Sequence, residues 1–398
     1  MDIPTLQKTL RELELDGWLI YDFHGQNPTA LTALGLEGHM LTRRVCYLVP
    51  AEGEPTALVH AIELLSFPKE VPGRRQSYTS WASFKAALEG LLARLPRRRL
   101  AMEYFPLGAI PYLSRVDAGT VELVRSLGVE VVSSAELVQR FLCRWTPHQL
   151  ASHVRALRAI DDAKDAAFEQ IGIALRRGLE VSEIAIQKFL LEEFARMHLE
   201  CDHPPIVAVN AHAGDPHYET SEKTRTPIRK GDLVLIDLWA RGKGQGDVYA
   251  DITWVGFCGD RPGAKAEEIF RIAADARDAG LEVVRAAWRE KRTLEGWQVD
   301  RVVRDHIASK GYGEKFIHRT GHSIGTRVHG DGANLDDFET HDTRHLLEGL
   351  AFSIEPGIYL PEQGLGVRTE IDVAITPEGP QVFSKIQQDI VRIPCEVT

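Results

Sequence analysis

The first third of the chain alternates between short apolar runs and longer amphipathic segments. The apolar runs are rich in β-branched and aromatic residues, and polar or proline-bearing loops bound them, which is typical of strands. They lie at Gly17–Phe23, Arg44–Val49 and Leu100–Tyr104. Between the last two, Ser83–Leu95 carries apolar residues at helical spacing. Residues 1–145 are therefore predicted to form one α/β domain of ordinary size.

The pattern changes at Arg144–Pro147. Thr146 followed by Pro147 is typical of a helix N-cap and first helical residue, and a helical pattern continues to about His198. We place the domain boundary here, with residues 146–398 as the second domain. Its later part has strand-like runs and two helical patterns, which predict an α+β architecture. The strand-like runs are Leu233–Trp239, Val248–Phe257, Ala351–Leu360 and Gly366–Thr376, and the helices begin near Pro262 and cover Leu294–Lys310.

Composition narrows the class of protein. Hydrophobic residues make up 44% and charged residues 26% of the 398 residues, as in soluble globular proteins. The net charge of −10 gives no electrostatic basis for binding nucleic acid or an anionic membrane. The five cysteines are dispersed without a CxxC pair, which indicates reduced thiols. With no signal sequence and no apolar run long enough to cross a membrane, we expect a cytoplasmic protein.

Carboxylates at the ends of apolar strands are the main chemical signal. Asp237, Asp251, Glu355 and Glu370 all lie within or directly after such runs. A buried carboxylate without a partner is costly, so four of them in one domain suggest a common cause. Two divalent cations would balance four negative charges and could activate a shared water. Four separate ion pairs or strand-end turns are the structural alternative.

Two further residues fit a metal centre. His322 lies in the glycine-flanked segment Thr320–Gly325 and offers an imidazole ligand. Arg368 precedes Glu370 by two residues, so on one strand both side chains would point to the same face. An arginine in that position could hold a ligand carboxylate in place.

Taken in order, five motifs resemble those of the pita-bread metallopeptidases, the family of methionine aminopeptidase, aminopeptidase P and prolidase. The motifs are Gly231–Asp237, Asp251–Thr253, Thr320–His322 with Val328-His329, Ile354–Gly357 and Gly366–Glu370. The resemblance implies an α+β pita-bread catalytic domain in residues 146–398. It also implies that residues 1–145 are the α/β creatinase-type N-terminal domain that the proline-specific members carry.

The resemblance assigns roles residue by residue. It implies two divalent metal ions, Mn²⁺ foremost, with Co²⁺ or Zn²⁺ as alternatives. The implied metal ligands are Asp237, Asp251, His322, Glu355 and Glu370, with Asp251 and Glu370 bridging. Glu355 would also move a proton between the bridging water and the leaving amine. His329 would contact the scissile carbonyl and stabilise the oxyanion.

Further residues match positions around the substrate. The resemblance places His217 among the catalytic residues that line the pocket, and His318 at the proline end of the substrate. Tyr359 matches a pocket tyrosine, and Thr253 and Arg368 would support the ligands. The implied reaction is hydrolysis of Xaa-Pro bonds by a metal-bridging hydroxide, as in a prolidase-like dipeptidase. The alternative is an aminopeptidase P-type enzyme on longer peptides, or another exopeptidase specificity. Relatives commonly form homodimers, and we expect the same here.

Several positions depart from the family pattern. Asp251 lies fourteen positions after Asp237, where eleven are usual, and Gly242–Gly246 is expected to lengthen a hairpin turn. Trp254, Ser323 and Gly330 replace the common arginine, glycine and glutamate. We expect these three residues to lie beside the pocket, where they would affect substrate preference.

Two other functional classes compete with the metallopeptidase. Gly321–Gly325 also satisfies G-x-S-x-G, the serine nucleophile motif, with Asp331 and His341 as possible partners of Ser323. The motif is preceded by a weak strand and followed by glycines, which disfavours a nucleophile elbow. A metal-free binding protein on the same fold is the third class, because fold does not dictate function. All five ligand positions are intact here, which favours catalysis.

Overall fold

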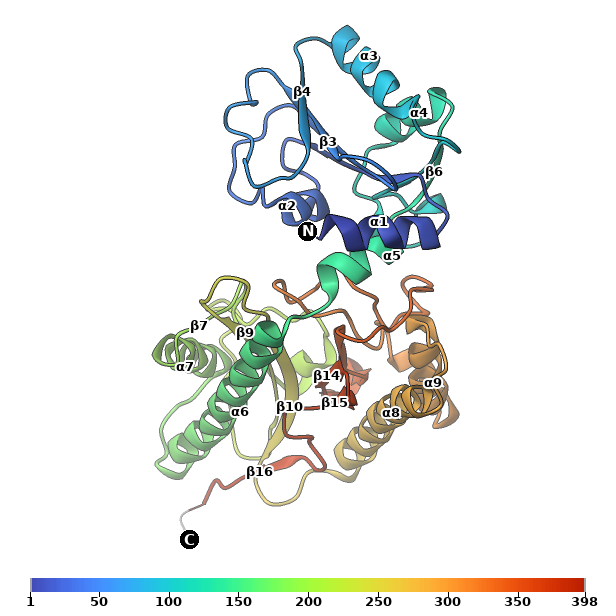
Figure 1. Cartoon of the computed structure of the whole chain (residues 1–398). Helices are drawn as coiled ribbons and strands as arrows, with labels where there is room; N and C mark the ends of the chain where they lie inside the picture. The colour runs from blue at the N-terminus through green and yellow to red at the C-terminus, as the bar shows by residue number, and fades with distance from the viewer. Residues whose placement is uncertain (1, 397–398) are drawn as a thin grey trace. The chain divides into compact units, whose positions relative to one another are not determined.

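The computed structural model describes residues 2–396. The chain divides into two compact units, Met1–Cys143 and Arg144–Thr398. Within the described residues, no helix combines the length and apolar character that a membrane crossing needs. Figure 1 shows the helices and strands of both units.

The first unit is a six-stranded mixed sheet with the order β4-β3-β2-β1-β5-β6. Its strands are β1 Gly17–Phe23, β2 Arg44–Pro50, β3 Thr56–His60, β4 Arg74–Tyr78, β5 Arg99–Met102 and β6 Glu130–Ser133. Its α-helices are α1 Ile3–Glu12, α2 Pro28–Leu34, α3 Trp81–Leu92, α4 Ala118–Ser126 and α5 Ala135–Val138. The strands and the helix predicted for this region are confirmed, with small shifts at their ends.

Both faces of this sheet are buried, because alternate residues of its strands enter two separate cores. Trp18 and Ile20 of β1 pack with residues of α1, α2 and α5. Leu19 and Tyr21 of the same strand pack with residues of α3 and α4. Since successive strand residues point to opposite faces, the helices cover the sheet from both sides. The α/β class expected for this part of the chain is confirmed.

The second unit combines long helices with several small sheets. Its α-helices are α6 Pro147–Arg176, α7 Glu183–Arg196, α8 Ala264–Arg289 and α9 Gly296–Ser309. The strands are β7 Leu199–Glu200, β8 Ile206–Val209, β9 Leu233–Gly242, β10 Ala250–Cys258, β11 Ala351–Ile354, β12 Gly357–Leu360, β13 Leu365–Arg368, β14 Ile371–Thr376, β15 Gly379–Gln381 and β16 Val391–Ile393. One sheet has the order β16-β10-β9-β7, with β8 also paired to β9. The others are β11-β14-β15 and β12-β13.

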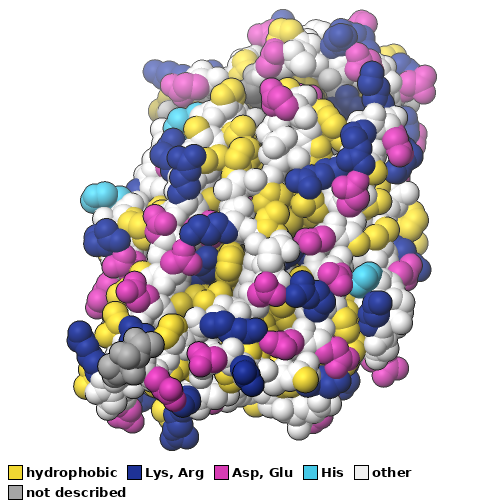
Figure 2. Space-filling view, turned by 90° about the horizontal axis from the view of Figure 1, so that it is seen from below, with side chains coloured by type: hydrophobic (Ala, Val, Ile, Leu, Met, Phe, Trp, Pro, Cys, Tyr) yellow, Lys and Arg dark blue, Asp and Glu magenta, His cyan; other side chains and the backbone are white. Residues whose placement is uncertain are grey.

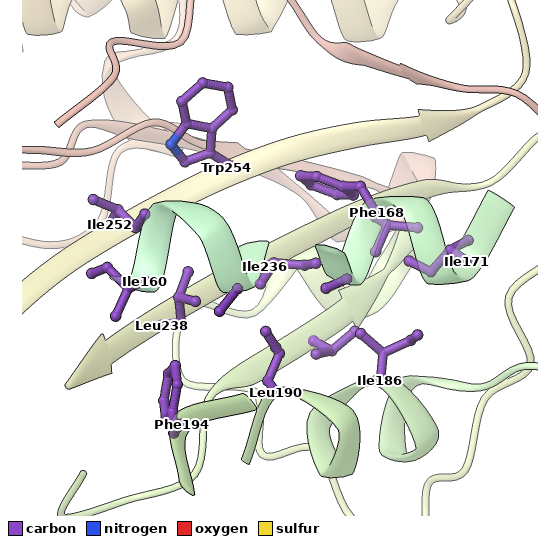
Figure 3. Packing of buried hydrophobic residues seen from close by; sticks show 14 of the residues in the cluster. Ile160, Phe168, Ile171, Ile186, Leu190, Phe194, Ile236, Leu238, Ile252 and Trp254 are labelled. Atoms are coloured by element: carbon purple, nitrogen blue, oxygen red, sulfur yellow. The ribbon is translucent and has the colours of Figure 1, made fainter. Parts of the chain in front are cut away.

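The hairpin of β9 and β10 separates two cores of this unit. Ile236, Leu238 and Ile252 pack against α6 and α7, as Figure 3 shows. Leu233, Leu235 and Val255 alternate with them along the strands and pack on the other side with residues of α8, β12 and β13. Figure 1 shows α6 and α7 on one side of β9 and β10, and α8 and α9 on the other. This arrangement is the α+β pita-bread architecture that the sequence predicts.

Three sequence-based predictions about elements need correction. The single helix expected to reach His198 is two helices, because the chain turns at Gly178 with φ of 65°, a conformation that glycine adopts readily. The strand expected over 351–360 is broken after Ile354, where Pro356 has no N–H for a ladder. The strand expected over 366–376 is broken between Arg368 and Ile371. Arg368 and Glu370 therefore do not share one strand.

The close packing of Phe168 on α6 predicts that removing its ring lowers the free energy of unfolding. Phe168 is 4% exposed and packs so closely over Gly256 that a Cβ there would lie 2.6 Å from its ring. Phe168→Ala should lower the free energy of unfolding of the second unit by about 3–5 kcal/mol, because it leaves a cavity in a close-packed core. Denaturant unfolding measures the loss. Phe383→Ala, at a 37% exposed position, is the matched control and should cost far less; equal losses would contradict the packing described here.

Candidate metal centre

Strands β9 and β10 place two carboxylates on one face. In this antiparallel pair Asp251 lies opposite Trp239, and Thr253 lies opposite Asp237. Directly opposite residues share a face, and residues two apart on one strand do too. The apolar residues between them face α6 and α7 (Figure 3). The carboxylates therefore point to the other side of the hairpin.

Three of the predicted ligands converge on this face. One ligand atom each of Asp251, His322 and Glu370 lies within 4.8 Å of the others, and all three side chains are buried. His322 Nε2 is 3.6 Å from Asp251 Oδ2 and 3.4 Å from Glu355 Oε1. Three of the predicted carboxylate ligands, Asp251, Glu355 and Glu370, therefore lie around the imidazole of the fourth predicted ligand, His322.

The fifth, Asp237, is connected to this group through an arginine and a threonine. The Arg368 guanidinium contacts Asp237 Oδ2 and donates from Nε to Thr253 Oγ1 at 3.1 Å. Thr253 Oγ1 in turn donates to Glu370 Oε2 at 2.7 Å. Arg368 and Thr253 thus bind the carboxylates that they were expected to support, although Arg368 ends β13 and Glu370 lies in the break before β14.

The buried carboxylates of this cluster repel one another, and a positive charge among them would be stabilising. Burial raises the pKa values of Asp251 and Glu370 well above their ordinary range, and neighbouring carboxylates raise them further. Asp251 Oδ1 and Glu370 Oε1 are buried oxygens that accept no hydrogen bond. An unpartnered buried carboxylate oxygen is costly, and divalent cations prefer such oxygens together with imidazole. The residues present therefore fit a divalent metal centre.

His322 is held in the tautomer that a metal ligand needs. Its Nδ1 lies 3.1 Å from the carbonyl oxygen of Ser323, which can only accept, so Nδ1 carries the proton. Nε2 is left with a free lone pair directed toward Asp251 and Glu355. The Ser353 hydroxyl accepts the His322 backbone N–H and donates to Glu355 Oε1, both at 3.0 Å. Ser353 thus links the positions of these two residues.

His329 lies next to His322 at the exposed side of the centre. The two rings are edge to face, with centroids 4.3 Å apart. The proximity of His322 lowers the pKa of His329 to about 3, and desolvation adds to the effect. His329 is therefore a neutral imidazole, which can still donate one hydrogen bond.

His318, Tyr359 and Arg368 form a hydrogen-bonded chain. His318 Nδ1 faces the Arg319 carbonyl oxygen at 2.7 Å and so carries the proton, and burial lowers the pKa of His318 to about 4. The Tyr359 hydroxyl donates to His318 Nε2 at 2.7 Å and accepts from Arg368 NH1 at 3.2 Å. Both ring nitrogens of His318 are thus engaged, and only its ring surface is available to a ligand. Tyr359 is 2% exposed and orients His318 from behind.

His217 is the predicted residue that the structure joins least closely to the centre. Its side chain is exposed, and its backbone N–H donates to Asp215 Oδ1 at 3.1 Å. The next residue anchors the loop, because the Tyr218 hydroxyl donates to the buried Glu183 Oε2 at 2.6 Å. No hydrogen bond between described residues connects the His217 ring to the carboxylate cluster.

The sequence analysis missed two buried residues behind the ligands. Asp372 Oδ2 accepts the backbone N–H of Asp251 at 2.8 Å, and His153 Nε2 lies 3.8 Å from the same oxygen. Both side chains are fully buried. Asp372 could have been found as a charged residue in the apolar run after Glu370. His153 gave no such signal, because it lies on a helix nearly one hundred residues before Asp251.

One of the unusual positions, Trp254, does not lie beside the carboxylates as expected. Trp254 faces α6, on the side of the hairpin opposite the carboxylates, and its ring packs against the Lys164 ammonium at 3.4 Å. Ser323 is buried, and its hydroxyl accepts the Gly332 N–H at 3.0 Å. Alternation along β10 sends Trp254 to the face away from Asp251 and Thr253.

The serine hydrolase alternative finds no support in this geometry. His341 is exposed and bonds Asp337 at 2.7 Å, and Asp331 contacts Arg327. Neither contacts Ser323 among the described residues, and no helix follows the G-x-S-x-G segment before β11. A nucleophile elbow requires that helix.

The chain is similar to known peptidases. A peptidase from Bacillus subtilis, YqhT, is 32% identical over 265 residues, which are 66% of this chain and 68% of that protein. An Xaa-Pro dipeptidase from Lactobacillus helveticus is 30% identical over 257 residues, 65% of each chain. The crystal structure of dipeptidase PepE from Mycobacterium ulcerans superimposes with a TM-score of 0.75 at 22% identity, covering 98% of this chain and 96% of that one.

The family match covers the residues of the metal centre. The model of metallopeptidase family M24 matches residues 155–377, more than half of the chain. That segment contains Asp237, Asp251, His322, Glu355 and Glu370. The chain therefore belongs to metallopeptidase family M24.

Proposed function

We propose that this protein is a metal-dependent exopeptidase that hydrolyses Xaa-Pro dipeptides. The observation that carries the proposal is the buried set of Asp251, His322 and Glu370, with carboxylate oxygens that lack hydrogen-bond partners. The substrate class is supported by the Lactobacillus helveticus relative, which is named an Xaa-Pro dipeptidase. We further propose residues 1–145 as the N-terminal domain and residues 146–398 as the catalytic domain.

The proposed ligands are Asp237, Asp251, His322, Glu355 and Glu370. Two divalent cations bound there, Mn²⁺ in the first place, would activate a water molecule and polarise the scissile carbonyl. The buried oxygens of Asp251 and Glu370 that have no partner among residues 2–396 support the assignment of both residues as ligands. Asp372 fixes the backbone of Asp251, and Arg368 and Thr253 fix Asp237 and Glu370.

Glu355 is the proposed proton carrier. Burial opposes its ionisation, but His322, His318 and Arg368 outweigh burial and lower the pKa of Glu355. It is therefore ionised and can accept a proton from the attacking water. It can then deliver this proton to the proline nitrogen as the amide bond breaks.

His329 and His318 are proposed to contact the substrate. Neutral His329 can donate a hydrogen bond to the carbonyl oxygen as negative charge develops on it. His318 offers only its ring surface, which would pack against a proline ring. This supports a proline subsite on the Tyr359 side of the centre. We keep His217 as a proposed pocket residue that reaches the substrate from the loop anchored by Tyr218.

The remaining proposals concern the setting of the enzyme. Five dispersed free cysteines support a cytoplasmic location, where thiols stay reduced. The net charge of −10 argues against nucleic acid as a partner. The Lactobacillus helveticus relative supports proline-containing dipeptides or short peptides as substrates. On the face drawn in Figure 2, basic and acidic side chains are interspersed. The resemblance to proline-specific relatives supports a homodimer.

Hydrolysis assays test the proposal directly. We expect cleavage of Ala-Pro with added Mn²⁺ and loss of cleavage with a chelator. Ala-Pro-Gly should be a poorer substrate, since the proposal is a dipeptidase. Preference for the longer peptide would indicate an aminopeptidase instead, and chelator-resistant cleavage would contradict the metal mechanism.

Substitution of the ligands should separate metal binding from catalysis. Asp251→Asn and Glu370→Gln should each abolish tight Mn²⁺ binding and activity together, because each removes a negatively charged ligand. His329→Ala should keep the metal but lower kcat by about 10²–10³, the usual cost of removing one oxyanion donor. Calorimetric metal titration and steady-state kinetics measure both effects. Full activity in either ligand variant would refute the site.

The raised pKa values also predict a pH effect on stability. Folded Asp251 and Glu370 retain protons at pH values where the unfolded chain, with ordinary pKa values of 3.8 and 4.5, has released them. The folded metal-free protein thus binds more protons, and its free energy of unfolding falls as pH rises above about 4, until the folded groups ionise. Mn²⁺ replaces those protons and should remove the decline. Thermal unfolding between about pH 4.5 and 8, with EDTA or Mn²⁺, measures it; identical profiles would contradict the assignment.

A further inference from the structure

A carboxylate outside the ligand set lies close to the metal centre. Strand β7 pairs with β9 so that Glu200 lies opposite Arg241, and Asp202 follows two residues after the end of β7. The Trp239 indole Nε1 donates to Asp202 Oδ1 at 2.8 Å. On its other side Trp239 lies opposite Asp251. Asp202, Trp239 and Asp251 thus form a row across three neighbouring chain segments.

This row is on the face of the sheet that carries the ligands. Trp239 follows Asp237 by two residues, so both point to the same side of β9. The Asp202 carboxylate, held by the Trp239 indole, therefore lies at the rim of the face that carries the ligands.

No lysine or arginine among residues 2–396 pairs with Asp202, and the nearest basic side chain is His203, whose Nδ1 lies 3.7 Å from Asp202 Oδ1. The nearby Glu200 pairs with Arg241 at 2.8 Å, and Arg241 NH1 also donates to the Thr326 carbonyl oxygen at 2.9 Å. Asp202 Oδ1 accepts from the indole and from the His203 backbone N–H, at 3.0 Å. Its Oδ2 accepts no hydrogen bond from residues 2–396, and the side chain is 42% exposed.

The position of the row indicates which part of a substrate it meets. Arg368 connects Asp237 to Tyr359 and His318, where we place the proline ring. Trp239 lies two residues further along β9, about 7 Å from Asp237 and away from that end. The side chain of the residue before the proline would therefore extend toward Trp239 and Asp202.

We propose that Trp239 and Asp202 form a specificity subsite for a basic side chain, lysine or arginine, at the Xaa position of Xaa-Pro substrates. The indole would pack against the aliphatic stem, and the free oxygen of Asp202 would accept a hydrogen bond from the charged head. Trp239 also fixes the carboxylate, so little ordering is needed on binding. This inference rests on the proposed function and adds the preferred class of substrate.

The test compares three dipeptides that differ in charge at the Xaa position. Lys-Pro and norleucine-Pro have side chains of similar length, so their kcat/KM ratio isolates the ammonium, and Glu-Pro reverses the charge. The wild-type protein should prefer Lys-Pro over norleucine-Pro about three- to tenfold, the range for a partly exposed, charge-assisted pair. Asp202→Asn should abolish this preference, leave norleucine-Pro within about twofold and improve Glu-Pro.

A control variant and a binding measurement make the result unambiguous. Asp260→Asn removes an exposed carboxylate beyond the far end of β10 and should leave the preference unchanged. Absence of a wild-type preference, or an equal loss on all three dipeptides in Asp202→Asn, would overturn the subsite. If no Xaa-Pro dipeptide were cleaved, the proposed function would fail. Calorimetric binding of Lys-Pro and norleucine-Pro would then decide the subsite separately, since an Asp202-dependent difference in Kd supports it and equal Kd values overturn it.

Discussion

The repulsion among buried carboxylates is the constraint on which the second unit depends. Asp237, Asp251 and Glu370 are each less than a tenth exposed, and Glu355 lies against the same imidazole. Without counter-charge, such a group either takes up protons or pushes its members apart. The surrounding structure meets this demand only in part. Arg368 supplies one positive charge, Thr253 supplies one hydroxyl, and two carboxylate oxygens stay unpartnered. In the metal-free protein, protons on Asp251 and Glu370 relieve the remaining repulsion, and divalent cations would replace them on binding.

The fold makes this concentration of charge possible by giving β9 and β10 two different faces. Ile236, Leu238 and Ile252 on one face are buried under α6 and α7, so the hairpin is held rigidly from that side. The other face is then available for polar residues. The loop with His322 and the chain breaks at Glu355 and Glu370 bring the remaining ligands from three other segments. A rigid support of this kind keeps ligands in place when no metal is bound.

Residues behind the centre orient the ligand side chains through hydrogen bonds. Ser353 connects His322 with Glu355, and Asp372 holds the backbone of Asp251. Tyr359 occupies one nitrogen of His318, so that this histidine presents a ring surface. These contacts are short and come from β10, β11, β12 and β14. In the proposed enzyme, the centre has one proline-facing end and, through Trp239 and Asp202, a second end of different chemistry.

The sequence by itself determined the class of each half, most element positions and the identity of the candidate ligands. Alternating apolar residues mark which strands are buried, and carboxylates at the ends of such strands are rare without a partner, so both signals are local. Only the tertiary structure showed which distant segments of the chain lie in contact. The strands end at Ile354 and Arg368, where the chain turns so that Glu355 and Glu370 face the centre. His153 and Asp372 contact each other behind the ligands only in the folded chain. Trp254 was expected beside the pocket, yet its place on the helix-facing side follows from the register of β10. Periodicity along one segment does not specify which segments meet, because that depends on packing among all of them.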